Sequence, residues 1–160
     1  MPSITASTYS DLVKQKRAKQ PDAKPFEVED LATAFIRLAN GTTLLLEASW
    51  ATHSSFGDDY GVTLFGTEGG AELKVNNYNV NDTLRFFQDV AGEPADIKSR
   101  ITGNDGVATV INEFLSIINS GSWSQHNGQR GLYLARLIDA CYTSAREGRE
   151  VVLTSHTSTL

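Results

Sequence analysis

The sequence has few of the features that mark disulfide-rich, membrane-spanning or secreted proteins. It contains one cysteine among 160 residues, Cys141, so an internal disulfide framework is excluded. No apolar run approaches the length of a membrane span. The first residues lack the basic start and apolar middle of a signal peptide. We therefore expect a cytoplasmic location and no contact with a membrane.

Positive charge is also scarce. The chain has 14 Lys and Arg against 19 Asp and Glu, which gives a formal net charge of -5. The densest basic segment, residues 14–19, lies in a polar stretch that we interpret as a solvated face. This charge balance argues against nucleic acid as a partner.

Several motifs for cofactors, metals and nucleophiles are missing. No Gly-x-Gly-x-x-Gly occurs, and Gly66–Gly70 is followed by a strand-like run, which predicts a hairpin turn rather than a phosphate cradle. His53, His126 and His156 are dispersed, so no zinc spacing exists. No serine lies in a Gly-x-Ser-x-Gly elbow. The sequence thus predicts no catalytic, cofactor-binding or metal-binding residue in this chain.

The length and the 40% hydrophobic content predict one folded domain over residues 1–160. The clearest local signal is Asn40-Gly41 between two apolar runs, which is typical of a two-residue hairpin turn. That turn would pair Phe35 with Leu46 on one face and Ile36 with Leu45 on the other. Both faces are largely apolar, so we expect helices on one face and a further cover on the other.

The remaining segments complete an α+β pattern. Further strands are expected at Ser3–Tyr9, Tyr60–Gly66, Ala71–Val75, Thr83–Gln88 and Val151–Leu153, and connections at Asp11–Pro25 and Ala91–Asp105. Helical spacing of apolar residues predicts one helix from about Val107 to Ile118 and another from about Leu134 to Ala145. We expect a mostly antiparallel sheet with helices packed on one face, and we expect the other face to be an oligomer interface.

One stretch concentrates side chains that suit ligand binding. Trp50 precedes a segment that holds His53, Phe56, Asp58 and Asp59 between two expected strands. Aromatic faces cover C–H surfaces of a sugar or polyol, while Asp and His side chains hydrogen-bond hydroxyl groups. These five residues are our substrate-side candidates. The alternative is a polar connection with a packed phenylalanine.

Three stretches together resemble a known family. They are FEVEDLATAFIRLANGTTLLLEASW, VTLFGTEGGAEL and GLYLARLIDACYTSAREGREVVL, which ends in Ser-Ala-x-x-Gly-Arg-x-Val. Their order and spacing resemble the C-terminal half of the glucose–fructose oxidoreductase/inositol dehydrogenase (Gfo/Idh/MocA) family. The likeness runs from about Ser3 to Leu153. In inositol dehydrogenases, a Tyr-Gly-Tyr-Asp segment of the pocket aligns with Phe56-Gly57-Asp58-Asp59, although the two tyrosines are not matched.

The resemblance implies a substrate-side and oligomerisation domain. Members join an N-terminal Rossmann domain that binds NAD or NADP to a C-terminal domain with a large sheet, and they act on sugars, polyols and related compounds. The motifs of the Rossmann half, including its catalytic lysine, do not occur in this sequence. We therefore expect the isolated chain to be catalytically inactive, with NAD or NADP bound by the full-length parent. Family members often pack two subunits through the open sheet face, which implies a homo-oligomer.

Two other hypotheses remain. The chain could be a free-standing homo-oligomeric module that binds a sugar-like molecule without redox chemistry. It could also be a structural dimerisation unit without any ligand.

Overall fold

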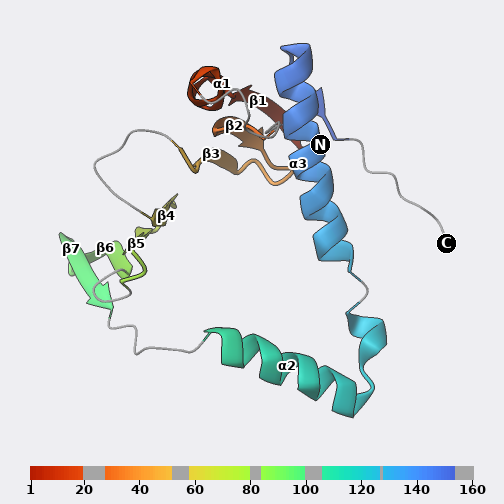
Figure 1. Cartoon of the computed structure of the whole chain (residues 1–160). Coiled ribbons are helices and arrows are strands. Elements are labelled where there is room, and N and C mark those ends of the chain that lie inside the picture. Colours follow the sequence, from red (N-terminus) through yellow and green to blue (C-terminus); the bar gives the residue numbers. More distant parts are fainter. Residues whose placement is uncertain (20–27, 52–57, 80–83, 100–105, 127, 154–160) are drawn as a thin grey trace. The chain divides into compact units, whose positions relative to one another are not determined.

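The computed structural model describes residues 1–19, 28–51, 58–79, 84–99, 106–126 and 128–153. They form two compact units (Figure 1): the first comprises Met1–His53 with Ser124–Leu160, and the second comprises Ser54–Trp123. Each unit contains a four-stranded antiparallel sheet. The expectation of a single domain over residues 1–160 stays a prediction.

The first unit is built on the sheet of β1 (Ser3–Tyr9), β2 (Leu31–Arg37), β3 (Thr43–Ser49) and β8 (Val151–Val152). Its strand order is β3-β2-β1-β8. Helix α3 (Gln129–Glu147) packs along β1 and β8, as Figure 1 shows, and a shorter helix, α1 (Asp11–Ala18), follows β1. Strands β1 and β8 are far apart in sequence, so their pairing brings both ends of the described chain together.

The core of the first unit lies between α3 and one face of this sheet. Ile4, Ala34 and Ile36 point to that face and pack with Ala140 of α3. The hydroxyl of Ser144, fully buried in the same helix, accepts a hydrogen bond from Ala6 N–H at 3.0 Å and donates one to Arg149 O at 2.7 Å. Polar groups as well as apolar ones therefore join α3 to β1.

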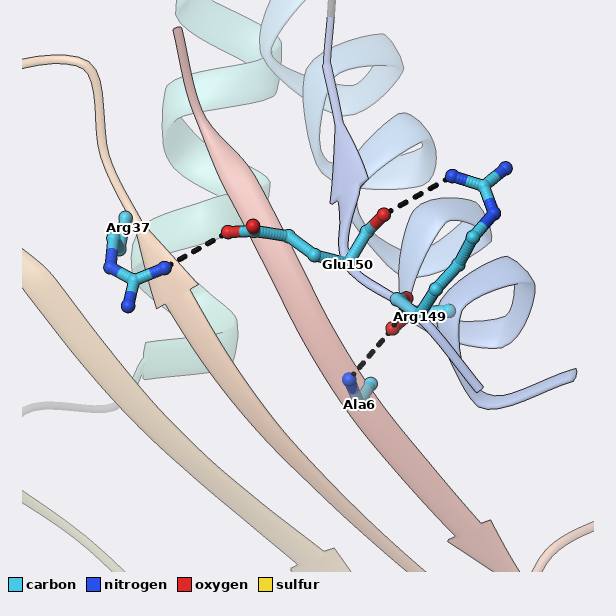
Figure 2. A network of polar contacts seen from close by, with 5 residues as sticks. Ala6, Arg37, Arg149 and Glu150 are labelled. Atoms are coloured by element: carbon cyan, nitrogen blue, oxygen red, sulfur yellow. Dashed lines mark hydrogen bonds and ion pairs between the residues drawn. The ribbon is translucent and has the colours of Figure 1, made fainter. Parts of the chain in front are cut away.

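The link from α3 to β8 contains further polar contacts (Figure 2). Gly148 ends the helix with a left-handed φ of 64° and donates its N–H to Ser144 O at 2.8 Å. Beyond it, Arg149 bonds the carbonyl of Glu150 at 3.2 Å. The Glu150 carboxylate pairs with Arg37 of β2 at 2.9 Å. These contacts direct the chain from the helix back onto the sheet.

The β2–β3 hairpin forms where the sequence predicts it, but its register differs by one residue. Leu38 N–H bonds Thr42 O at 2.8 Å, so the loop has three residues, and Gly41 alone takes a positive φ, 88°. This geometry matches a type I turn closed by a glycine bulge, the next most common hairpin loop. The predicted pairing of Phe35 with Leu46 is wrong, because Phe35 lies opposite Leu45.

The corrected register separates the two faces of the hairpin. Ile36 and Leu44 share the face that carries α3, whereas Phe35 and Leu45 lie on the opposite face. Leu45 is 75% exposed there. The first sheet thus has one face with a helix and one that the described residues of its own unit leave open.

The second unit is a meander of four seven-residue strands in the order β4-β5-β6-β7. They are β4 (Asp59–Phe65), β5 (Gly70–Asn76), β6 (Leu84–Val90) and β7 (Glu93–Ser99). Along the chain follow α2 (Gly106–Ser120), none of whose residues is buried, and a short 3-10 helix, η1 (Trp123–Gln125).

The residues of this second sheet alternate between an apolar and a polar face. The apolar face carries, among others, Tyr60, Val62, Leu64, Leu73, Val75, Phe86 and Ile97. On the other face, Lys74 pairs with Glu72 at 2.7 Å, and Arg85 lies 3.7 Å from Asp96. Alternation of this kind is typical of an antiparallel sheet with one solvated face, and only Phe65 and Phe87 add large apolar side chains to the polar face in the described strands.

Two expected connections contain regular structure. Helix α1 lies within the predicted connection Asp11–Pro25, and Leu12 N–H near its start bonds the carboxylate of Asp30 at 2.8 Å. Strand β7 lies within the predicted connection Ala91–Asp105. It forms because Ala91 and Gly92 take positive φ values of 56° and 85°, as a two-residue hairpin turn requires.

The predicted fold class is confirmed. The chain is α+β, its sheets are antiparallel, and a helix covers one face of the first sheet. The use of an open face for oligomerisation stays a prediction.

Candidate functional site

The five substrate-side candidates fall into three groups in the structure. His53 and Phe56 lie outside the described residues. Trp50 belongs to the first unit, whereas Asp58 and Asp59 belong to the second.

Trp50 follows β3 and is bonded to the segment that precedes β2. Its indole N–H donates to the carbonyl oxygen of Glu29 at 2.6 Å. The Glu29 carboxylate accepts a hydrogen bond from Tyr142 Oη, on α3, at 2.8 Å. Glu29 thus connects two exposed aromatic side chains from different elements. The hydrogen bond to Glu29 anchors Trp50, and the residue is still 57% exposed.

Asp58 and Asp59 meet the β5–β6 connection at the start of β4. Tyr78 Oη donates to Asp58 Oδ2 at 2.9 Å. The backbone N–H of Asp58 donates to Asn77 Oδ1 at 3.1 Å. The N–H of Asn77 in turn lies 2.9 Å from Asp58 O and 3.1 Å from Asp59 Oδ1. We call Asp58, Asp59, Asn77 and Tyr78 the Asp58–Tyr78 cluster.

The backbone of this cluster is strained. Asn77 and Tyr78 have φ values of 48° and 61°, and Asn79 N–H closes the turn on Asn76 O at 2.9 Å. Asparagine tolerates the left-handed region, but a residue such as tyrosine loses roughly 1–2 kcal/mol there. Such outliers gather at ligand-binding and catalytic sites, where the surrounding contacts hold them in place. The turn presents Tyr78 to Asp58 at this cost.

The tyrosine hydroxyl of the cluster is held in its protonated form. The hydrogen bond to Asp58, and after it the negative charge of Asp58, raise the pKa of Tyr78 above its usual value. The pKa of Tyr142 is raised in the same way, first by its hydrogen bond to Glu29. At neutral pH both phenols therefore remain hydrogen-bond donors to a carboxylate.

The cluster can bind hydroxyl groups. A carboxylate offers about four acceptor sites, so Asp58 retains acceptor capacity beside the bond from Tyr78, and the phenol oxygen can also accept. Tyr78 is 71% exposed, and its ring provides an apolar surface next to these oxygens. Carboxylate, phenol and open ring face together suit a small polyhydroxy molecule.

Sequence reasoning found the carboxylates of this cluster but missed Asn77 and Tyr78. In the sequence, the Asn-rich segment NNYNVND between the expected strands Ala71–Val75 and Thr83–Gln88 predicts only a turn. The available signal was a tyrosine inside a two-residue turn whose conformation favours Asn, Asp and Gly. A bulky residue at such a position is unusual enough to suggest a second role.

The described residues do not form a metal site or a nucleotide cradle. Within them, no group of three or more His, Cys, Asp or Glu side chains could hold a metal ion. The turn at Gly66–Gly69 joins two antiparallel strands, with Gly66 N–H bonded to Gly69 O at 2.8 Å. Its amides therefore do not meet a helix N-terminus as a pyrophosphate site requires. In the described part of the chain, no helix has the length and apolar content to cross a membrane.

The antiparallel α+β fold agrees with a family comparison. Residues 1–153 match the family described as "Oxidoreductase family, C-terminal alpha/beta domain". The chain therefore belongs to the Gfo/Idh/MocA oxidoreductase family, in which it corresponds to the C-terminal domain. No curated protein matches the sequence significantly.

Solved structures show the same fold. The aldose-aldose oxidoreductase from Caulobacter crescentus, complexed with glycerol, is 22% identical, with a TM-score of 0.62 over 94% of this chain and 41% of that one. An oxidoreductase from Agrobacterium radiobacter, in complex with NAD+, L-tartaric acid and magnesium, is 21% identical, with a TM-score of 0.56 over 93% and 42%. The chain thus spans about two fifths of the length of these proteins.

Proposed function

We propose that this chain forms the substrate-side and oligomerisation part of an NAD(P)-dependent oxidoreductase that acts on a sugar, polyol or related hydroxy or carbonyl compound. Its Asp58–Tyr78 cluster contacts substrate hydroxyl groups. The observation that carries the proposal is the 2.9 Å bond between Tyr78 and Asp58 on a strained turn, in a domain of an oxidoreductase family.

The ligands of the structural relatives support this substrate class. One relative is complexed with glycerol, and another with L-tartaric acid. Both molecules carry hydroxyl groups on adjacent carbons. The Asp58 carboxylate and the Tyr78 phenol lie within hydrogen-bonding distance of each other, so two neighbouring hydroxyls can reach them together.

A separate domain supplies the nicotinamide cofactor in this proposal. The sequence contains no Gly-x-Gly-x-x-Gly, and its glycine-rich turn lies between antiparallel strands. One of the relatives holds NAD+, and it is more than twice as long as this chain. A Rossmann domain therefore carries the cofactor and the hydride transfer, and the isolated chain is catalytically inactive.

Self-association uses the open face of the first sheet. Phe35 and Leu45 lie opposite each other on the face away from α3, and they are 37% and 75% exposed. Exposed apolar side chains that lie next to one another favour an interface between subunits. A second copy that covers this face would bury both.

Binding of small polyols to the isolated chain tests the substrate side. Amide NMR spectra are recorded during titration with glycerol, a neutral polyol that the carboxylates of the cluster do not repel. We expect saturable shifts at Asp58, Asn77 and Tyr78. Asp58→Asn and Tyr78→Phe should weaken binding about ten-fold, because a hydrogen bond to a charged group contributes roughly 1.5–3 kcal/mol.

The matched control is Tyr9→Phe, which removes the hydroxyl of an exposed tyrosine in the first unit. It should leave the affinity unchanged. Shifts that persist equally in Asp58→Asn and Tyr78→Phe would contradict a role for the cluster.

A further inference from the structure

The second sheet has a cavity at the end away from the Asp58–Tyr78 cluster. It has a volume of about 730 Å³ and lies beside the turn at Gly66–Gly69, which joins β4 to β5. Asp58 precedes β4 and Phe65 ends it, so the two locations are separated by roughly 20 Å of extended strand. The cavity is therefore distinct from the cluster.

Two phenylalanines and a glycine form one row across this cavity. Phe65 of β4 lies opposite Gly70 of β5, and Gly70 lies opposite Phe87 of β6, so all three face the same side of the sheet. Neighbouring strands are separated by about 4.8 Å, which puts the two phenylalanine backbones roughly 10 Å apart. Phe65 is 94% exposed, and Phe87 is 38% exposed. The row is an aromatic slot with a bare backbone in the middle.

The glycines keep this slot open. A methyl group on Gly70 would lie 2.9 Å from Leu64 O and 3.7 Å from the Phe87 ring. On Gly69 it would lie 2.6 Å from Phe87 O. A side chain at Gly70 would collide with the backbone and enter the space beside the Phe87 ring, and one at Gly69 would collide with the Phe87 carbonyl. The ring of Phe87 also covers the backbone at Gly70, so packing alone can explain Phe87. Packing does not explain Phe65.

The charged groups around the slot are acidic. Glu68, Asp89 and Asp96 line the cavity, and none of the described residues that line it is a lysine or arginine. Arg85, on the same face, lies 3.7 Å from the Asp96 carboxylate and holds it at the rim. Carboxylates accept hydrogen bonds from hydroxyl groups and repel anions. The lining therefore favours a neutral ligand with one apolar face and several hydroxyls.

We propose that this slot, formed by Phe65, Gly70 and Phe87, binds the ring of a neutral pyranose sugar. The C–H face of the ring stacks on the phenylalanines, and its hydroxyls donate to the carboxylates of Asp96 and Glu68. This site is independent of the hydroxyl-binding role proposed for the Asp58–Tyr78 cluster. It gives the domain a second place for carbohydrate at the opposite end of the same sheet.

The test is an amide NMR titration of the chain with D-glucose, D-glucitol and choline in parallel. We expect saturable shifts of Gly66, Gly69 and Gly70 with D-glucose. The acyclic D-glucitol should bind more weakly, because it lacks the flat C–H face. Phe65→Ala should reduce the affinity for D-glucose about five-fold, in line with the loss of one aromatic stacking contact.

Two controls separate this site from other effects. Phe86→Ala removes the neighbouring ring on the opposite face, where Phe86 is 41% exposed, and it should leave the glycine shifts unchanged. Tyr78→Phe should also leave them unchanged, so failure at one site does not imply failure at the other. Because Phe65 is almost fully exposed, its replacement should not unfold the sheet.

The proposal is overturned if D-glucose causes no saturable shift at the three glycines. It is also overturned if Phe65→Ala binds like the wild type, or if choline alone shifts these amides, which would indicate a cation site.

Discussion

The hydroxyl of Ser144 provides the sharpest test of how α3 is held on its sheet. This side chain is fully buried, accepts from Ala6 N–H at 3.0 Å and donates to Arg149 O at 2.7 Å. Ser144→Ala removes both bonds, so Ala6 N–H loses this acceptor and Arg149 O loses this donor. Each bond contributes about 1 kcal/mol net, and a buried group that loses its partner costs roughly 1–3 kcal/mol.

A smaller effect opposes this loss. Alanine is the best helix former, and the gain over serine within a helix is about 0.5 kcal/mol. The expected loss in the free energy of unfolding is therefore about 2 kcal/mol. With a urea dependence of about 2 kcal/mol per molar, the unfolding midpoint should fall by about 1 M.

Urea unfolding followed by far-UV circular dichroism measures this change. The matched control is Thr143→Ala, one residue earlier on α3, where the hydroxyl only accepts a 3.3 Å bond from exposed Arg146. It should stay within about 0.5 kcal/mol of the wild type. If Ser144→Ala matches that control, the bonds of Ser144 do not stabilise the first unit and our reasoning is refuted.

Three further predictions follow from the same structure. Gly148→Ala should lower the free energy of unfolding by about 1 kcal/mol in the same urea assay, because Gly148 has a φ of 64°, and an unchanged midpoint would contradict this. In ultraviolet pH titration, the raised pKa of Tyr78 should fall in Asp58→Asn. The stabilising hydrogen bond from Tyr78 to Asp58 is present below pH 10.0, the ordinary tyrosine value, and is lost as pH rises through the raised pKa of Tyr78. Equal titration curves for the wild type and Asp58→Asn would argue against this bond. Leu45→Lys should prevent the self-association that light scattering detects, whereas Leu44→Lys, on the face that carries α3, should lower the free energy of unfolding instead. A wild type that is monomeric at high micromolar concentration would refute the proposed interface.

Local sequence patterns predicted most strands and both long helices, because periodicity and turn residues act over a few positions. They did not predict the register of the β2–β3 hairpin. Asn40-Gly41 is compatible with a two-residue or a three-residue loop, and the choice decides whether Leu45 or Leu46 of β3 shares a face with Phe35. A shift of one residue exchanges the two faces of a strand, so the open face could not be identified from the sequence.

The two missed elements depend on features outside their own sequence. The N–H of Leu12 in α1 bonds the carboxylate of Asp30, which lies on the far side of a long connection. Strand β7 contains Pro94 and acidic residues that are unfavourable in strands, and it pairs with β6 through a turn at Ala91-Gly92. Contacts of this kind override local preference.

The sequence predicted only the two carboxylates of the candidate site, because the rest of the site also depends on contacts between distant segments. Asp58 and Asp59 stood out because two carboxylates lie next to each other between expected strands. Tyr78 is twenty residues away, and only the pairing of β4 with β5 brings its turn to Asp58. Sequence spacing alone could not associate them.

Parallel equilibrium titrations of the isolated chain with NADH, NADPH and glycerol test the central claim most directly. The claim assigns substrate contacts to this chain and cofactor contacts to another domain. We predict saturable glycerol binding that Asp58→Asn weakens, and no binding of either nicotinamide at micromolar concentration. Micromolar affinity for NADH or NADPH, or glycerol binding that is the same in Asp58→Asn as in the wild type, would contradict the account.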